Sequence, residues 1–563
     1  MHCLYVLQKI NHVKVKNTMK KNKQSKFSKS FVILFAFITI IHMVLILFYG
    51  MRKEGFHEDE YYSYWTSAGY AQILPSGHYD WRTGPEMQEQ FMVSEGERFQ
   101  FDAVIGYQIE DVHPPLYYLC LNIIMSLFPG KFFKWFAIIV NTVFSLVTLF
   151  GVTFFFYHVM EGKDKEKYAL LAAFLYAIAP STLSNVMFAR MYGMSAMWNV
   201  LYACVLLMAV KQLDGSKKKF AAWTMGGALI CYLSFLTHYF SLLLPGLLTA
   251  GICIYVLIKR KHMVRMLIYG ASMLMGIGLA ILTYPACLGH MFGGYRGTGV
   301  LNELNLTGFG GRIRFFGNML NEFAAGNLLG LILLCLAIAL ILFGVLIKKN
   351  WKTTDEIQHR EWYWHGMGLV CCMVSCLILM KISLYVYGAG CRFFFPVLAL
   401  MIPWMGCFTL KMIQEMLSNS SLQPLKKNGL LVCVMACLLV VLPYVKGHLD
   451  NKILFLYEDD AQKVAFAEEY KEYPLVLLCD RDNMHRTWYI CNQIWPFHNI
   501  FYTDYEHIML DSFDEPTIQS ADKLVVYMDA PEEVVQKLVD ENPNLDKYTL
   551  IRHDPFYYIY LLE

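Results

Sequence analysis

The stretch that decides the fold class lies near the N-terminus, at residues 31–49, and reads FVILFAFITIIHMVLILFY. It contains one Thr and one His but no formally charged residue. A helix of about 20 such residues crosses the roughly 30 Å hydrocarbon core of a bilayer. The run is too long for the apolar core of a signal peptide, and no small-residue cleavage site follows it. Residues 31–49 therefore predict an uncleaved membrane anchor.

The whole chain has the composition of a multi-pass membrane protein. Of its 563 residues, 56% are hydrophobic and 17% are charged, whereas soluble domains have about 45–50% and about 25%. The excess lies in further apolar runs of membrane-spanning length. The formal net charge is only +3, so the chain lacks the strong positive field that nucleic acid requires. We predict the lipid bilayer as a partner and no nucleic acid.

Short basic loops set the predicted orientation in the membrane. They lie at 163–167, 217–219, 259–261, 348–349 and 426–427. Lys and Arg in short loops mark the cytoplasmic side. If all five loops and the Lys-rich N-terminus 1–29 lie inside, the chain crosses roughly eleven times. The long polar segments 51–112 and 286–325, and the C-terminus, then lie outside the plasma membrane.

One short apolar segment, residues 114–128, decides whether this topology holds. It is about 15 residues long, shorter than a membrane span, and opens with Pro114 and Pro115. If it crossed fully, the basic loops at 163–167 and 217–219 would move outside. We therefore predict a re-entrant or interfacial helix that starts just after the prolines. An extra crossing is the alternative.

The segment from residue 446 onward differs in character from the rest. Residues 475–478 and 523–527 have the pattern of short buried strands, and 531–539 that of an amphipathic helix. Such alternation predicts a small α/β domain with a structural or acceptor-facing role. The predicted organisation has three parts: a cytoplasmic N-terminus (1–29), a transmembrane module (30–445) and an extracytoplasmic α/β domain (446–563).

An acidic cluster follows the first apolar run, in the sequence FHEDEYY at residues 56–62. The three carboxylates, Glu58, Asp59 and Glu60, are costly so close to the bilayer if they are even partly desolvated, which indicates a functional site. A carboxylate there could act as a general base toward an acceptor hydroxyl. Acidic residues also favour the first turn of a helix. The local sequence therefore leaves a solvated helix start open as well.

Cationic or titratable side chains stand at four other helix boundaries that the predicted topology places outside. They are His113 in EDVHPPLYY (110–118), Arg190 in FARMY (188–192), His238 in THY (237–239) and Arg392 in CRFFFP (391–396). An isolated Arg on the outer side breaks the charge rule, so we expect an anionic partner for it. The planar guanidinium group is suited to phosphate. We expect these side chains to converge with Asp59 and Glu60 on one face.

Three motifs in this order resemble a known family. Asp59-Glu60 after the first helix, His-Pro-Pro-Leu-Tyr-Tyr from His113, and Ala-Arg-Met-Tyr around Arg190 are similar to motifs of glycosyltransferase family 39-like proteins. These are bacterial relatives of the protein O-mannosyltransferases and of the aminoarabinose lipid A transferases. The match is strongest over residues 56–209, and Arg392-Phe393 with Pro396 resembles a segment near the family's last helices. The resemblance implies a polytopic α-helical membrane protein with the C-superfamily glycosyltransferase fold.

The resemblance also implies a reaction. Family members transfer a sugar directly from a polyprenyl-phosphate carrier to an extracytoplasmic protein, glycan or glycolipid, with inversion at the anomeric carbon. By position, Asp59 would be the catalytic base and Glu60 its helper. The implied substrate-binding residues are His113, Arg190, Tyr192, His238 and Arg392, with the two arginines on the lipid phosphate. In these relatives Ser-Gln-Glu commonly precedes Ala-Arg-x-Tyr, whereas residues 186–188 here are Val-Met-Phe, so the donor-sugar contacts do not carry over.

Some questions stay open at this point. No cofactor is firmly implied; a divalent cation could be shared by carboxylates and a lipid phosphate, although no ligand set requires one. The sequence does not specify the sugar, the acceptor or the oligomeric state. A transporter or lipid flippase is the main alternative, but the apolar segments show no interrupted pair repeated in two halves. A binding protein whose function lies in residues 446–563 is another alternative. It would not need acidic and cationic residues at the ends of several helices.

Overall fold

The computed structural model describes residues 27–69, 79–303, 305, 307–330, 332–333, 337, 356–418, 429–479 and 481–563. Within this part, seven helices are long and apolar enough to cross a membrane. An eighth span results if α8 (Lys165–Ile178) and α9 (Pro180–Met187), which meet at a 51° bend, are taken together. The seven comprise α2 (Lys29–Arg52), α7 (Trp135–Val159), α10 (Tyr192–Lys211), η2 with α12 (Tyr239–Lys259), α13 (Met263–Thr283), α18 (Glu356–Ile382) and α19 (Phe395–Ser418).

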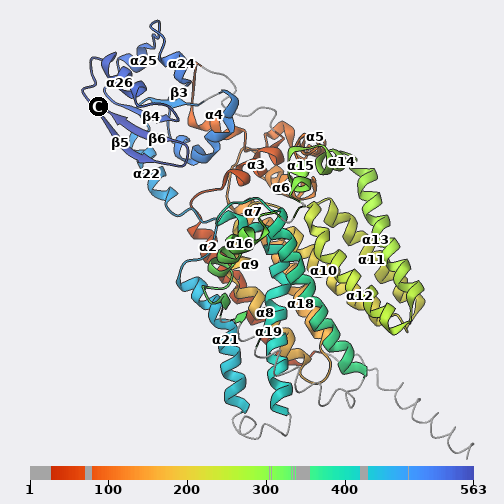
Figure 1. Ribbon diagram of the computed structural model, residues 1–563. Coiled ribbons are helices and arrows are strands. Elements are labelled where there is room, and N and C mark those ends of the chain that lie inside the picture. Colours follow the sequence, from red (N-terminus) through yellow and green to blue (C-terminus); the bar gives the residue numbers. More distant parts are fainter. Residues whose placement is uncertain are drawn as a thin grey trace, which may run out of the picture.

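Two further long helices lie beside these spans (Figure 1). Helix α11 (Lys217–Phe235) packs against α10 and α13, and α21 (Gly429–Leu449) packs against α19. Both would complete crossings in the predicted topology. The crossing expected just before the basic loop at 348–349 falls largely on residues outside the described ones. The total of roughly eleven therefore stays a prediction.

The helix after Pro114 and Pro115 is short. Helix α6 (Leu116–Leu127) has 12 residues, which gives a length of about 18 Å. A bilayer core of about 30 Å is too thick for it to cross. Its first backbone N–H, from Leu116, donates to the carbonyl of Leu236 at the end of α11. Helix α6 therefore lies at the C-terminal end of α11, as a non-spanning element.

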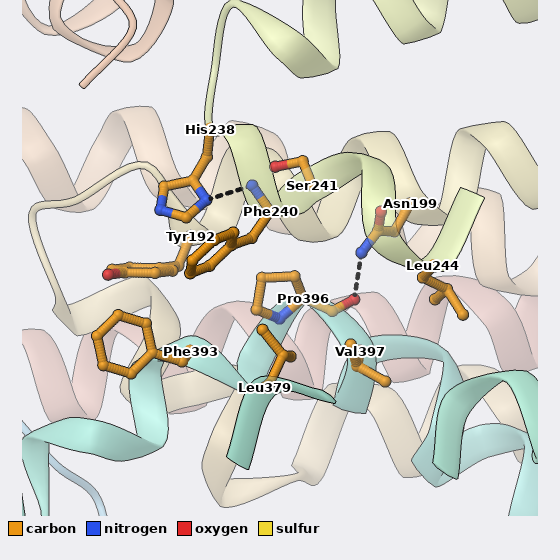
Figure 2. A pocket seen from close by; sticks show the side chains of 10 residues that line it. All are labelled: Tyr192, Asn199, His238, Phe240, Ser241, Leu244, Leu379, Phe393, Pro396 and Val397. Atoms are coloured by element: carbon orange, nitrogen blue, oxygen red, sulfur yellow. Dashed lines mark hydrogen bonds between the residues drawn. The ribbon is translucent and has the colours of Figure 1, made fainter. Parts of the chain in front are cut away.

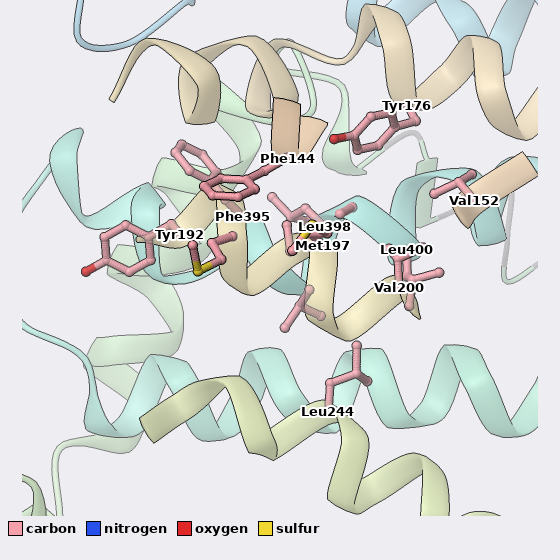
Figure 3. Close-up of a cluster of buried hydrophobic side chains, with 14 of the residues drawn as sticks. Phe144, Val152, Tyr176, Tyr192, Met197, Val200, Leu244, Phe395, Leu398 and Leu400 are labelled. Carbon is pink, nitrogen blue, oxygen red and sulfur yellow. The ribbon is translucent and has the colours of Figure 1, made fainter. Parts of the chain in front are cut away.

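Helix α10 is the centre of the transmembrane core. It packs against α7, α11 and α19, and Figure 3 shows side chains of α7 and α19 meeting those of α10 around Met197 and Val200. The backbones of α7 and α10 approach closely at Gly151, where a Cβ atom would lie 2.7 Å from a methyl group of Val200. Small residues permit such close helix packing in membranes. This close packing fixes the ends of these helices beside which the site lies.

The C-terminal part forms a six-stranded sheet with the order β1-β3-β2-β4-β6-β5. The inner strands β2, β3 and β4 are parallel and fully buried, and β1, β5 and β6 are antiparallel to their neighbours. Helices cover both faces, as a parallel core requires. The strands are β1 (Asp80–Arg82), β2 (Leu475–Leu478), β3 (Ile500–Thr503), β4 (Leu524–Met528), β5 (Tyr548–His553) and β6 (Tyr558–Leu562).

Shorter helices complete the two parts of the chain. Those outside the bundle at its outer end are α3 (Glu58–Ala68), α4 (Gly84–Glu89), η1 (Glu95–Glu97), α5 (Phe101–Glu110), α14 (Ala286–Phe292), α15 (Tyr295–Asn302), α16 (Phe309–Phe323) and η4 (Ala389–Phe393). Those of the C-terminal part are α22 (Asp460–Tyr470), η6 (Arg481–Ile490), α23 (Cys491–Ile494), α24 (Tyr505–Ile508), α25 (Pro516–Gln519) and α26 (Glu533–Asp540). The strands expected near 475–478 and 523–527, and the helix near 531–539, are thus confirmed.

Four strands of this sheet, β1, β3, β5 and β6, were not predicted from the sequence, and β1 is the one that comes from a distant part of the chain. Strand β1 comes from the first outer loop and pairs with β3, with Asp80 opposite Tyr502. Next to it, the N–H of Gly84 donates to the carbonyl of Phe497. A Cβ atom at Gly84 would lie 1.8 Å from the carbonyl oxygen of Trp495, so only glycine fits there. The first outer loop and the C-terminal part therefore form one unit.

Aromatic rings join this unit to helix α3. The ring of Trp488 lies 5.6 Å from that of Tyr62 and 5.7 Å from that of Trp65, and its Nε1 donates to Gln90. Trp495 lies 5.0 Å from Phe132. Such ring pairs add about 0.5–1.5 kcal/mol each beyond the area they bury. The C-terminal part is thus packed directly onto the helix that carries Asp59.

Replacement of Trp488 by Ala should destabilise this junction. Loss of a buried Trp side chain costs about 3–5 kcal/mol, because the rings of α3 lose their packing partner. We expect a lower thermal unfolding midpoint in detergent, measured by intrinsic fluorescence. Trp81→Ala is the matched control, since Trp81 is only partly buried and packs on Phe501 within the sheet. An equal decrease for both variants would contradict a special role of the Trp488 junction.

Candidate functional site

The candidate site is built from helix ends and links at the end of the bundle next to the C-terminal sheet (Figure 1). Each sequence motif lies at the boundary of a different structural element. Asp59 and Glu60 lie in the first turn of α3, His113 in the link from α5 to α6, and Arg190 in the link from α9 to α10. His238 precedes η2, Tyr192 begins α10, and Arg392 lies in η4. The structure brings all seven predicted residues together.

Asp59 is at the centre of the cluster. Its carboxylate lies 3.0 Å from a terminal nitrogen of Arg392 and 4.0 Å from one of Arg190. The Asp59 side chain is 23% exposed, whereas those of Arg190 and Arg392 are 3% and 7% exposed. The acid thus reaches water while both cations are held inside. This is the arrangement expected if each outer arginine has an anionic partner.

The two arginines determine the protonation of Asp59. Burial alone would raise the pKa of this carboxyl group, but the charges of Arg392 and Arg190 outweigh that effect and hold the pKa well below its ordinary value. Asp59 is therefore ionised at neutral pH. The first turn of α3 adds to this, because the positive end of the helix dipole favours a carboxylate. The acidic cluster thus forms the first turn of a helix. The same cluster also lies in a charged site, because Asp59 pairs with Arg392.

His113 connects Arg190 to a further acid, Asp111. Arg190 can only donate, and one of its terminal nitrogens lies 3.2 Å from Nε2 of His113. That ring nitrogen must therefore accept, which leaves the proton on Nδ1, 2.6 Å from the Asp111 carboxylate. Burial lowers the pKa of His113, so the ring is neutral at pH 7. The pKa of Asp111 is lowered to about 2, because His113 and Arg190 outweigh its burial. Asp111 was missed in the sequence, although it stands two residues before His113.

Glu60 has a different environment from Asp59. It is fully buried and forms an ion pair with Lys53 at 3.0 Å, whose side chain is 1% exposed. The Glu60 carboxylate also accepts the backbone N–H groups of His57 and Ala189, both at 2.8 Å. Lys53 in turn donates to the carbonyl of Phe455. Glu60 therefore ties the start of α3 to the residue just before Arg190, and Lys53 is a second residue that the sequence analysis did not single out.

The Lys53→Met variant should be strongly destabilised. Burial already raises the pKa of Glu60 and lowers that of Lys53, so each depends on the other for its charge. Removal of one partner of a buried pair costs about 3–5 kcal/mol. In the double variant Lys53→Met/Glu60→Gln no charge is left unpaired, and we expect thermal stability to recover in part. Additive losses in this double-mutant cycle would contradict the coupling.

Tyr192 and His238 border a pocket next to the arginines (Figure 2). Their rings are 5.6 Å apart, and the ring of His238 lies 6.4 Å from that of His113. Nδ1 of His238 accepts the N–H of Phe240, so the neutral ring carries its proton on Nε2. Burial lowers the pKa of His238 to about 3. The pocket is lined by Tyr192, Asn199, His238, Phe240, Ser241, Leu244, Leu379, Phe393, Pro396 and Val397.

Several hydrogen-bond donors in the site have no partner among the described residues. They are Nε of Arg190 and both Nε and Nη1 of Arg392. Buried polar groups are normally paired, and a buried guanidinium donor without a partner carries a large desolvation penalty. The two arginines therefore present free, fixed donors beside a water-accessible carboxylate. An oxyanion with several oxygen atoms is the ligand that fits them best.

A metal centre receives no comparable support. Among the described residues, no group of three or more His, Cys, Asp or Glu side chains is arranged to hold a metal ion. Asp59 and Asp111 are instead directed at arginine and histidine partners.

Comparisons with known proteins agree with the fold. No protein-family model matches the chain, and no curated protein sequence matches it. Among solved structures, ArnT from Cupriavidus metallidurans bound to undecaprenyl phosphate has a TM-score of 0.50 at 12% identity, over 95% of this chain and 98% of that one. The same protein in the apo state has a TM-score of 0.47 at 11% identity, over 94% and 98%.

A third solved structure is the Archaeoglobus fulgidus oligosaccharyltransferase tethered to an acceptor peptide. It has a TM-score of 0.43 at 11% identity, over 91% of this chain and 69% of that one. The present chain has the C-superfamily glycosyltransferase fold, with several transmembrane helices and a small sheet domain at the C-terminus. The fold expected from the three ordered motifs is confirmed.

Proposed function

We propose that this protein is a membrane glycosyltransferase that moves a sugar from a polyprenyl-phosphate donor to an acceptor outside the membrane. The observation that carries the proposal is the pair Arg190 and Arg392, with unpartnered buried donors next to the partly buried carboxylate of Asp59. The fold neighbour ArnT, which is described bound to undecaprenyl phosphate, supports a lipid phosphate as the ligand of this fold.

The arginines would bind the phosphate and stabilise its departure. The bond from the anomeric carbon to the phosphate oxygen breaks in the transition state, and negative charge develops on the leaving polyprenyl phosphate. Donors that are already fixed in a buried site lower this barrier without reorganisation. Planar guanidinium groups can each give two parallel hydrogen bonds to phosphate oxygens. The lipid tail would remain in the bilayer beside the outer helix ends.

Asp59 would act as the general base on the opposite side of the sugar. The acceptor hydroxyl gives its proton to the carboxylate as the oxygen bonds to the anomeric carbon and the phosphate leaves. Attack from the face opposite the phosphate inverts the anomeric configuration. In the empty site the arginines make Asp59 a weak base, since they hold its pKa low. A bound phosphate would compensate their charge and so raise the basicity of Asp59 when the donor is present.

The other predicted residues would position these groups. Glu60 holds the amides of His57 and Ala189, and thereby the spacing between Asp59 and Arg190. His113, held by Asp111, keeps the Arg190 guanidinium in place. Tyr192 and His238 would contact the donor from the pocket side. Residues 1–29 would lie in the cytoplasm, 30–445 would form the transmembrane module, and 446–563 would lie outside the plasma membrane with the site.

The reaction class can be tested in membranes that contain the full-length protein. We expect consumption of a radiolabelled polyprenyl-phosphate sugar and the appearance of labelled acceptor. Nuclear magnetic resonance of the product should show the anomeric configuration opposite to that of the donor, whether the sugar is a hexose or a pentose. Transport of an intact lipid-linked sugar across vesicles without cleavage of its phosphate bond would contradict the proposal and favour a flippase.

A further inference from the structure

The C-terminal part places an aromatic residue, which the proposed mechanism does not use, next to the start of helix α3. Residues 58, 62 and 65 recur at helical spacing and lie along one face of α3. Trp488 of η6 packs on that face, 5.6 Å from the ring of Tyr62 and 5.7 Å from that of Trp65. Tyr489, the next residue of η6, is half-buried and lies at the start of the same face, beside Glu58.

The phenol group of Tyr489 is directed at the first turn of α3. Burial, a hydrogen bond with Glu58 and the nearby charge of Asp59 raise the pKa of Tyr489 above its ordinary value. The phenol is therefore protonated at neutral pH. The ring of Tyr489 lies 4.6 Å from that of Phe556, which is also half-buried. The two rings form an aromatic surface beside the Glu58 and Asp59 carboxylates.

The arginines lie on a different side of α3 from this aromatic surface. The face that carries Asp59 and Ser63 is turned toward Arg190, which donates to the backbone carbonyl of Asp59 and to the Ser63 hydroxyl, both at 3.3 Å. Inverting transfer needs the acceptor and the leaving phosphate on opposite sides of the anomeric carbon, with the base on the acceptor side. If the arginines bind the phosphate, the acceptor would approach from the side of Glu58 and Tyr489.

The charges on this side limit the kind of acceptor that can bind. Glu58 and Asp59 are both partly exposed and adjacent in sequence. Arg486 of η6 does not neutralise them, because it forms an ion pair with Asp529 at 2.6 Å and lies over the ring of Phe556. A phosphorylated acceptor would be repelled by the two carboxylates. Hydroxyl groups, in contrast, can donate to them.

We propose that Glu58 and Tyr489 form the acceptor subsite, and that the acceptor is an uncharged saccharide unit. This inference rests on the proposed function. The apolar face of a sugar ring would stack on Tyr489, while hydroxyl groups at the ring edge would donate to Glu58 and Asp59. The attacking hydroxyl gives its proton to Asp59, its oxygen bonds to the anomeric carbon, and the polyprenyl phosphate leaves with the electrons of the broken bond.

A peptide acceptor fits this surface less well. Extended peptides bind by pairing their backbone with free N–H and C=O groups, typically at a sheet edge. The elements beside Asp59 here, α3 and η6, are helical, so most of their backbone groups are already bonded within the helix.

The first measurement is the chemical class of the product. Full-length protein in detergent solution receives a radiolabelled polyprenyl-phosphate sugar and cell-envelope fragments from cells that lack the protein. We expect the label to move to material that withstands protease digestion, with methylation analysis showing a linkage to an unphosphorylated sugar. Label on Ser or Thr peptides, or on a phosphorylated sugar, would overturn the acceptor class. If no label leaves the lipid donor, the proposed function itself fails.

Three variants then test the subsite at saturating donor. Tyr489→Ala should raise the apparent KM for the envelope fragments by about 5- to 10-fold, as loss of a ring contact predicts. Glu58→Gln should raise this KM by about 10-fold or more, because a hydrogen bond to a charged group is lost. Tyr489→Phe keeps the ring, so its KM should rise less than that of Tyr489→Ala. The dissociation constant of undecaprenyl phosphate should stay that of wild type in all three.

Tyr505→Phe is the matched control. Tyr505 of α24 also donates to a carboxylate, that of Glu533, but within the C-terminal sheet part (Figure 1). Its replacement should leave both constants unchanged. An unchanged KM in both Tyr489→Ala and Glu58→Gln would overturn the subsite. A loss of lipid affinity equal to the rise in KM would also overturn it, because the two residues would then act on the donor or on the fold as a whole.

Discussion

The Asp59→Asn variant should lose sugar transfer while its affinity for undecaprenyl phosphate stays the same or increases. Loss of a general base lowers the rate by about 10²- to 10⁴-fold. The affinity should not fall, because the Asp59 carboxylate forms an ion pair with Arg392 at 3.0 Å and competes with the phosphate for that donor. Transfer is measured with a radiolabelled polyprenyl-phosphate sugar, and affinity with undecaprenyl phosphate in nanodiscs.

A matched control separates this effect from a general change of charge. Asp102 lies exposed in α5, in the same outer loop as Asp59, so Asp102→Asn should keep normal transfer. Normal transfer by Asp59→Asn would remove Asp59 from the role of base. A joint loss of transfer and of lipid binding would instead indicate that Asp59 mainly holds the arginines in place.

The Arg392→Ala variant should show the opposite pattern in binding. Hydrogen bonds to charged groups contribute about 1.5–3 kcal/mol, so affinity for undecaprenyl phosphate should fall by about 10- to 150-fold, and transfer should fall with it. Arg392→Lys keeps the charge but loses the planar fork, and we expect it to recover only part of the affinity. The measurement is the dissociation constant of undecaprenyl phosphate for the three proteins.

The control for this prediction is Arg312, an arginine that also has an acidic partner but lies away from the site. Arg312 lies 3.4 Å from Glu303 and donates to the carbonyl of Ser383, away from Asp59. Arg312→Ala should leave lipid affinity unchanged. An Arg392→Ala protein with wild-type affinity would show that the phosphate is bound elsewhere. A full recovery by Arg392→Lys would mean that only the positive charge matters, and not the geometry of the guanidinium.

Much of the fold could be predicted because its signals are local. An apolar run such as residues 31–49 can satisfy its backbone inside a bilayer only as a helix. The all-apolar stretch Leu475–Leu478 similarly fits a strand buried on both faces, and it forms the centre of the sheet. Strand β1 could not be predicted. It has only three residues, and its pairing with β3 depends on a contact between distant parts of the chain.

The candidate site could be predicted where charge was conspicuous. Asp59, Arg190 and Arg392 stand out because ionised groups close to a bilayer are energetically costly and are therefore usually functional. Lys53 was missed since a basic residue at a helix end is ordinary in sequence, and only its complete burial against Glu60 gives it meaning.

The pairing of β1 with β3 has a consequence for how the protein is made. About 420 residues separate the two strands, which corresponds to roughly 20–80 s of synthesis at 5–20 residues per second. During that time the loop that contains β1 must remain without its pairing partner until the last part of the chain is made. Until β1 pairs with it, β3 is an open edge to which other chains can pair. A C-terminal fragment secreted without that loop would therefore be prone to aggregate, and final assembly of the site would be a late event in biogenesis.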